Sequence, residues 1–215
     1  MSTISTAVGL DRQSRVSGYM VKKGRFNNDT QNLQQIIAVF GEANTANQSG
    51  LTVTKREVTS AAEAGDLYGY GSPIHTMMRV LRPLSGDGVG GIPTVVFPQL
   101  PDAGATATVR AWTVTGTASA NATHTVIVNG RDNVDYKEYS FSVVSGDTAT
   151  VVAGKIKDAI NAVTSAPCTA TSTGAVMTAT SKWKGATSAE LDITISYGSN
   201  AAGLAYSQTT STDGA

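Results

Sequence analysis

The residues whose types and spacing could do chemistry lie in the stretch DLYGYGSPIHTMMRVL, residues 66–81. Gly69, Gly71 and Ser72 form a glycine-x-glycine-serine run, and His75 follows about one helical turn later. Such a run can cradle a phosphate when it leads from a strand into a helix, because free backbone N–H groups and the helix dipole then point at the anion. The same run can also be a plain turn that separates two helices.

The sequence before the glycines predicts a helix. Ser60 followed by Glu63 is a capping box, in which both side chains accept hydrogen bonds from amides at the start of a helix. The box predicts a helix over residues 61–68. Gly69 then stands where a left-handed C-terminal cap is expected.

The sequence after the glycines predicts a second helix. Ser72 is a suitable N-cap, and Pro73 suits the first helical position, where a missing N–H costs nothing. Apolar residues with helical spacing then predict a helix over residues 73–81: Ile74, Met77, Met78 and Leu81. Neither a Lys-Ser/Thr pair nor a third glycine follows. We therefore interpret Gly69, Gly71, Ser72 and Pro73 as a structural turn between helices, with an anion site as the alternative.

Other candidate catalytic residues are isolated from one another. Cys168 lies in an alternating strand pattern that favours a packed thiol over a nucleophile. His75 and His124 are far apart in the sequence and fall in different predicted domains, so they do not form a metal-binding pair. Ser72 beside His75 is the nearest approach to a nucleophile and base, and helix capping already explains Ser72.

Two further groups have structural interpretations as well. The spacing of Asp132, Asp135 and Glu138 lacks the ligand positions of a calcium loop, so a solvated loop is the favoured interpretation. Trp112 and Trp183 could form a sugar-binding platform, but packing is favoured for both. We accordingly predict a protein that is not an enzyme, with no catalytic residue, no cofactor and no metal.

The bulk composition excludes some classes of protein. The 215 residues carry 16 Lys and Arg against 16 Asp and Glu, which argues against a dedicated nucleic-acid binder. Charged residues make up 15% of the chain, a low share that is common in proteins that pack against copies of themselves and in secreted β modules. Residues 1–20 show no apolar signal segment, and no apolar run approaches the ~20 residues of a membrane helix. The chain is predicted to be soluble and made in the cytoplasm.

The first 31 residues show neither a helical nor a strand period. We interpret residues 1–31 as an extended arm, with a disordered tail as the alternative. The arm is basic because it contains five basic residues and only two acidic ones, Asp11 and Asp29. These five are the candidate inter-subunit contacts: Arg12, Arg15, Lys22, Lys23 and Arg25.

The remaining chain is predicted to have an α+β fold. Residues 32–103 form a small α/β unit, with strands at 34–41 and 51–59, the two helices, and the strand TVVF that ends at Pro98.

Residues 104–200 form a β-rich, sandwich-like domain that carries one helix. Its helix begins after Asp147, and a hairpin turns at Thr173-Gly174. Its other strands are predicted at residues 106–117, 124–130, 138–144 and 189–198. Residues 201–215 are predicted to be a polar tail, the incomplete end of the domain.

The order of several segments resembles a known family. These segments are QIIAVFGEA, EVTSAAEAGDLYGYGSPIHTMMRVLRP, IPTVVFPQ and, further on, FSVVSGDTATVVAGKIKDAINA. Together they resemble the N-terminal half of contractile-tail sheath proteins of bacteriophages, especially of Mu-like phages. In that family a helix leads into an aromatic-glycine-x-glycine-serine turn and a second, Met-containing helix, which correspond here to residues 61–68, 69–72 and 73–81. The resemblance spans most of residues 15–200.

The resemblance implies a structural subunit that polymerises around a tail tube and drives contraction for genome delivery. The implied partners are copies of itself in a helical polymer, the tail tube protein, and the baseplate and tail terminator proteins, with no nucleic acid and no membrane. The implied location is the virion tail, after assembly in the host cytoplasm. Sheath proteins of this type carry a further C-terminal region, so we expect either a fragment of a longer sheath or a relative without that region. The alternative functions are a carbohydrate-binding or adhesive β module and a nucleotide-dependent enzyme that uses residues 69–72.

Overall fold

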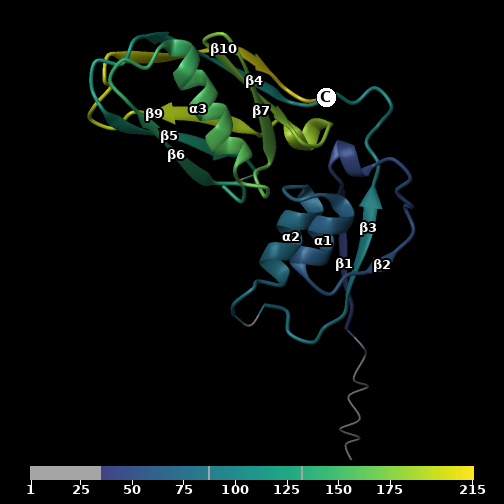
Figure 1. Ribbon diagram of the computed structural model, residues 1–215. Coiled ribbons are helices and arrows are strands. Elements are labelled where there is room, and N and C mark those ends of the chain that lie inside the picture. Colours follow the sequence, from purple (N-terminus) through teal and green to yellow (C-terminus); the bar gives the residue numbers. More distant parts are fainter. Residues whose placement is uncertain (1–34, 87, 132) are drawn as a thin grey trace, which may run out of the picture. The chain divides into compact units, whose positions relative to one another are not determined.

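A three-stranded sheet and two helices form the first part of the fold. The computed structural model describes residues 35–86, 88–131 and 133–215. Strand β3 lies in the middle of this sheet, parallel to β1 and antiparallel to β2 (Figure 1). The chain can return to β3 in parallel because two helices connect the strands. The elements are β1 (Ile37–Glu42), a 3₁₀ turn (Thr45–Asn47), β2 (Arg56–Glu57), α1 (Ala61–Tyr68), α2 (Pro73–Leu81) and β3 (Thr94–Gln99).

The helices cover one face of this sheet. Val39 of β1 and Val96 of β3 lie in one buried cluster with Ile74 and Met78 of α2, and the last three are fully buried. Ile74 and Met78 are four residues apart, so they project from the same side of α2. The helical period predicted from the sequence is therefore the period that fills this core.

The opposite face of the sheet is apolar and exposed. Phe40 is 61% exposed, and its ring stacks on that of Phe97 with centroids 4.9 Å apart. Ile36, the residue immediately before β1, is 57% exposed. Within the described chain this face is left open to solvent.

Two antiparallel sheets form the β-rich part. Their strand orders are β10-β4-β8-β7 and β6-β5-β9. Helix α3 packs against strands of both sheets (Figure 1). The elements are β4 (Val109–Gly116), β5 (Ala122–Asn129), β6 (Lys137–Val143), α3 (Ala149–Asn161), β7 (Cys168–Thr173), β8 (Val176–Ser181), a 3₁₀ turn (Ala186–Ser188), β9 (Asp192–Ser196) and β10 (Leu204–Thr212).

The core of this part lies between α3 and the sheets. Val152, Ile156 and Ile160 of α3 are fully buried. They share a cluster with Val126 of β5 and Met177 of β8. The predicted α+β class with a β-rich sandwich-like part is confirmed, with three α-helices and ten strands in the described residues.

Several boundaries differ from those predicted. The strand predicted at 51–59 is reduced to the two residues of β2. Strand β3 does not stop before Pro98 but runs to Gln99. Proline is tolerated there because β2 pairs with β3 only at Val95 and Val96, so the missing N–H breaks no bond on that side.

The start of α3 also differs. Thr148, not Asp147, is the N-cap, and its side chain accepts a hydrogen bond from the Val151 N–H. Asp147 is engaged elsewhere, because its carboxylate accepts from the Val144 N–H at 2.8 Å and pairs with Lys155 at 2.5 Å. These bonds lower the pKa of Asp147, the Lys155 bond most of all.

The expected polar tail contains a strand. Residues 204–212 form β10, which pairs antiparallel with β4 along almost the whole length of that strand. Its side chains are mostly exposed Ser, Thr and Gln, so it lacks the apolar alternation that marks a half-buried strand. By contacts, residues 36–215 form one compact unit, and the domain boundary near residue 103 stays a prediction.

Candidate functional site

The turn between α1 and α2 is held by capping bonds. Ser60 Oγ accepts from the Glu63 N–H at 3.1 Å, and the Glu63 carboxylate accepts from the Thr59 N–H at 2.9 Å. Ser72 Oγ accepts from the His75 N–H at 3.1 Å, and Pro73 occupies the first turn of α2. Each side-chain oxygen therefore satisfies a backbone donor at a helix start.

Both glycines of the turn have positive φ angles. Gly69 has φ 91° and ψ 135°, so the sign of φ is as predicted but the residue lies outside the left-handed helical region. A Cβ on Gly69 would collide with the amide of Asn44, which donates to the Tyr70 carbonyl at 2.9 Å. A Cβ on Gly71, at φ 83°, would collide with the backbone carbonyl of Ala166. The turn thus requires glycine for both conformation and space.

We expect Gly69→Ala to lower the free energy of unfolding by about 2 kcal/mol, through the strain of a positive φ angle and displacement of Asn44. The matched control is Gly174→Ala, because Gly174 also has positive φ but nothing lies near its missing Cβ. The control should cost about 1 kcal/mol, for strain alone. Urea denaturation of the three proteins measures the difference, and equal costs would show that Asn44 gives way freely.

The ring of His75 is buried and neutral. Its Nδ1 accepts a hydrogen bond from the Gly71 N–H at 3.1 Å, so the proton of the ring resides on Nε2. Burial, with a smaller contribution from the nearby charges of Arg79 and Lys182, lowers the pKa of His75 to about 4. Ser72 and His75 do not form a nucleophile–base pair here. Ser72 Oγ accepts from the His75 N–H as a helix cap, and the Gly71 N–H occupies Nδ1, the ring nitrogen that could act as a base.

The remaining nucleophile and base candidates lie in separate places. Cys168 is 1% exposed, and burial raises the pKa of its thiol to about 12, so thiolate is scarce at neutral pH. His124 is fully buried, and its Nε2 contacts the carbonyl of Asn200 at 2.9 Å. That contact requires an N–H on Nε2, so Nδ1 accepts from the hydroxyl of Tyr206 at 2.5 Å. His124 is part of the β-rich core and does not meet His75.

The acidic run is divided among separate partners. Asp135 forms an ion pair with Arg131 at 2.5 Å, and Glu138 accepts from the Tyr136 hydroxyl. Asp132 lies outside the described residues. Across the described ranges no cluster of three His, Cys, Asp or Glu is arranged to hold a metal ion.

The two tryptophans do not form a common platform. Trp183 is 1% exposed and lies beneath the guanidinium of Arg131, whose carbon is 4.7 Å from the ring centroid. Trp112 is half-buried against the β-rich core. The packing interpretation accounts for both residues.

The five basic residues proposed for the arm lie outside the described residues: Arg12, Arg15, Lys22, Lys23 and Arg25.

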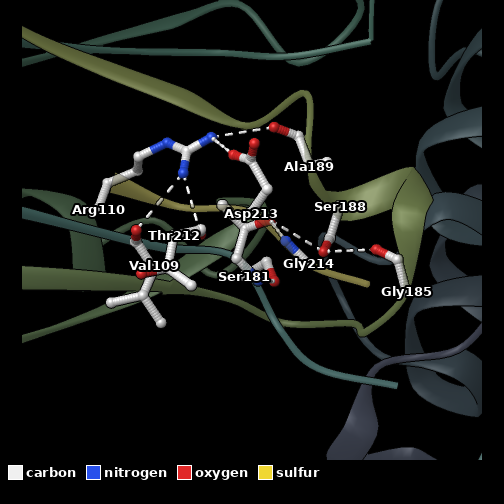
Figure 2. A network of polar contacts seen from close by, with 10 residues as sticks. Val109, Arg110, Ser181, Gly185, Ser188, Ala189, Thr212, Asp213 and Gly214 are labelled. Carbon is white, nitrogen blue, oxygen red and sulfur yellow. Dashed lines mark hydrogen bonds and ion pairs between the residues drawn. The ribbon is translucent and has the colours of Figure 1, made fainter. Parts of the chain in front are cut away.

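A buried arginine that the sequence did not single out organises the end of β10. Arg110 of β4 is 5% exposed. Its guanidinium donates to the carbonyls of Thr212 and Ala189, both at 3.0 Å, and to Asp213 Oδ1 at 2.7 Å. Figure 2 shows these groups arranged around the guanidinium, with Asp213 and Ala189 on one side and Thr212 on the other.

A chain of hydroxyl groups continues this network. The Gly214 N–H donates to Thr108 Oγ1 at 2.8 Å, and Thr108 Oγ1 lies 3.1 Å from Ser188 Oγ. Ser188 Oγ donates in turn to the Gly185 carbonyl at 2.8 Å (Figure 2). The network joins β4, the 3₁₀ turn at 186–188 and the segment after β10, and its groups satisfy one another. The role of the network is therefore structural, since its bonds hold the segment after β10 against β4 and the 3₁₀ turn.

Sequence reasoning missed Arg110 because its partners lie 79 to 103 residues away. One signal was available, since an arginine interrupts the β-branched pattern of TVRAWTVT and would need partners if its strand were buried.

The fold is that of a mixed α+β protein, and the polar groups described above either cap helices or join distant segments of the chain. No helix in the described ranges is long and apolar enough to cross a membrane.

One known protein gives a more particular comparison. Over 141 residues the chain is 32% identical to the Mu-like prophage FluMu tail sheath protein of Haemophilus influenzae. The match covers 65% of this chain and 27% of that protein, so the chain spans only about a quarter of its relative's length. No family model matches the chain. The similarity supports a relationship to a tail sheath protein.

Proposed function

We propose that this chain is a structural subunit of a contractile phage tail sheath, or a portion of one, that polymerises around a tail tube. The observation that carries the proposal is the 32% identity over 141 residues to a tail sheath protein. In such a polymer, function arises from contacts between copies that have two stable arrangements, extended and contracted.

Two exposed features support contacts with other subunits. The open face of the first sheet presents Phe40 and Phe97, an apolar pair of the kind that marks interaction surfaces. Strand β10 has a partner on one side only within the described chain, and residues 204–212 contain no charge. Exposed edge strands usually carry charges that prevent pairing, so an uncharged edge is compatible with contact to a neighbour.

The proposed partners are copies of the chain and the tail tube protein, with the baseplate and the tail terminator protein at the two ends of the polymer. Residues 1–31 are proposed as an inter-subunit arm, since extended segments can add strands to a neighbour's sheet. These assignments, the non-enzymatic role and assembly in the host cytoplasm rest on the relationship to the sheath protein.

Immunogold electron microscopy of phage particles from the host that carries the gene tests the proposal. An antibody raised against residues 104–215 should label the tail along its whole length. In contracted particles the labelled region should shorten and widen, because a sheath changes its helical arrangement. A pre-immune serum and particles from a deletion strain are the controls.

Other labelling patterns would contradict the sheath assignment. Gold confined to fibres or to the tail tip would favour the carbohydrate-binding or adhesive module. Tails that carry no gold, in particles whose sheath is intact, would exclude the chain from the assembled tail.

A further inference from the structure

A cleft between the N-terminus of α1 and the outer side of α2 is not used by any contact described so far. Its volume is about 410 Å³. Ala61 and Ala62 of α1 line it, together with His75, Arg79 and Arg82. The hydroxyl-bearing residues Thr164 and Ser165 complete the lining, which contains two arginines and no aspartate or glutamate.

The α1 side of the cleft offers backbone donors. The first N–H groups of a helix have no partner within it. Ser60 Oγ satisfies the Glu63 N–H, and the Ser60 carbonyl accepts from the Ala64 N–H. The amides of Ala61 and Ala62 have no partner among the described residues, and they lie at the positive end of the helix dipole.

His75 adds a second, independent donor. Its side chain is almost completely buried, at 4% exposure, yet it lines the cleft. Because Nδ1 accepts from the Gly71 N–H, Nε2 carries the proton. That N–H has no partner among the described residues, so it remains free to donate to a group within the cleft.

The arginines supply positive charge. Arg82 is fixed by bonds from its guanidinium to Thr94 Oγ1, the Gly90 carbonyl and the Ile92 carbonyl. Arg79 is exposed, and its guanidinium makes no hydrogen bond or ion pair with a described residue. Guanidinium groups match the planar, two-oxygen geometry of a carboxylate.

The acidic groups near the cleft are already engaged. Glu63 accepts from the amide and hydroxyl of Thr59, and Asp66 accepts from the Tyr70 hydroxyl at 2.9 Å. Neither carboxylate belongs to the lining of the cleft. An oxyanion entering the cleft would therefore meet donors and positive charge.

The rim of the cleft indicates the source of the oxyanion. Leu84 lines the cleft and is 100% exposed, and Tyr70 on the same lining is 37% exposed. Such a partly apolar rim gives no advantage to a small inorganic ion, but it can pack against the apolar atoms of a polypeptide. We propose that this cleft is a carboxylate-binding site that receives an acidic side chain of a neighbouring protein chain.

Imidazole NMR of the ¹⁵N-labelled protein tests the site, because the chain has two histidines and His124 serves as an internal reference. The probes are acetate, inorganic phosphate, a capped Leu-Glu-Leu-Glu peptide and its Leu-Gln-Leu-Gln counterpart, at constant ionic strength. The glutamate peptide should shift the His75 Nε2–H resonance saturably, at least about tenfold more tightly than acetate, while His124 stays unchanged. The glutamine peptide should produce no saturable shift.

Two variants complete the test. Arg79→Gln should weaken binding of the glutamate peptide at least about fivefold. Lys137→Gln, at an exposed position on β6 with the same change in charge, should leave the affinity unchanged. The backbone amide spectrum of each variant reports whether the fold is intact.

Several results would overturn the proposal. A His75 resonance that does not respond to the glutamate peptide would exclude the site. Saturable binding of phosphate without binding of the peptide would assign the cleft to a free ion. Equal affinities of the wild type and Arg79→Gln would remove the role of the guanidinium.

Discussion

Deleting residues 204–215 is expected to unfold the β-rich part of the protein. Strand β4 would lose its partner along one entire edge, although it is an interior strand of its sheet. The deletion also removes Leu204 from the core, where it is 4% exposed, and the Tyr206 hydroxyl from the fully buried His124. Losing the β4 pairing, the burial of Leu204 and the Tyr206–His124 bond should lower the free energy of unfolding by more than about 5 kcal/mol, which is comparable to the total stability of a small domain.

The deletion is measured by comparing chains 1–203 and 1–215 in circular dichroism melting and amide hydrogen exchange. Amides of β4 and β8 should exchange slowly in the longer chain and rapidly in the shorter one. Ser207→Ala is the control within β10, because that side chain is exposed and the strand pairing does not depend on it. Melting of chain 1–203 within ~2 °C of the longer chain would show that β10 is dispensable.

The same pairing bears on domain independence. The sequence predicts a domain over residues 104–200, but β10 pairs with β4 and residues 213–215 bond to Arg110, Thr108 and Thr106, so an excised piece able to fold is expected to extend through residue 215. The boundary near residue 103 remains a proposal.

Features encoded within a few residues could be predicted from the sequence. Ser60 with Glu63 and Ser72 with Pro73 define two helix starts, because a cap bonds to amides only two or three positions away. The Thr173-Gly174 hairpin is equally local, since two alternating runs flank a short turn. The amphipathic period of α3 also identified its buried side, Val152, Ile156 and Ile160.

Features that depend on distant pairing could not be predicted in this way. Strand β10 is polar, and it becomes a strand only because β4, about 90 residues earlier, offers an open edge. The bond between His124 and Tyr206 spans 82 residues, so no local pattern announces it. The cleft beside His75 could not be predicted either, because the sequence suggests an anion site only as the alternative at the glycine turn, and Gly69, Gly71 and Ser72 do not line the cleft. Its positive charge comes from Arg79 and Arg82, which follow the turn in the sequence.

Arg110→Met is expected to lower the free energy of unfolding by about 3–5 kcal/mol. Methionine keeps much of the apolar stem of arginine but donates no hydrogen bond. The carbonyls of Thr212 and Ala189 would lose the donors that Arg110 supplies at 3.0 Å. Urea denaturation followed by tryptophan fluorescence measures the loss, and the end of β10 should become the first segment to exchange its amides.

Asp213→Asn separates the role of the ion pair from that of the buried donors. The Asp213 side chain is 67% exposed while that of Arg110 is 6% exposed, so the pair at 2.7 Å is largely screened on one side. The substitution should therefore cost about 1 kcal/mol or less, because exposed ion pairs contribute little and asparagine can still accept from the guanidinium. In the double variant the cost should equal that of Arg110→Met alone, since no donor then remains for residue 213. If Asp213→Asn proves as costly as Arg110→Met, the charge pair rather than the bonds to the carbonyls holds β10 in place.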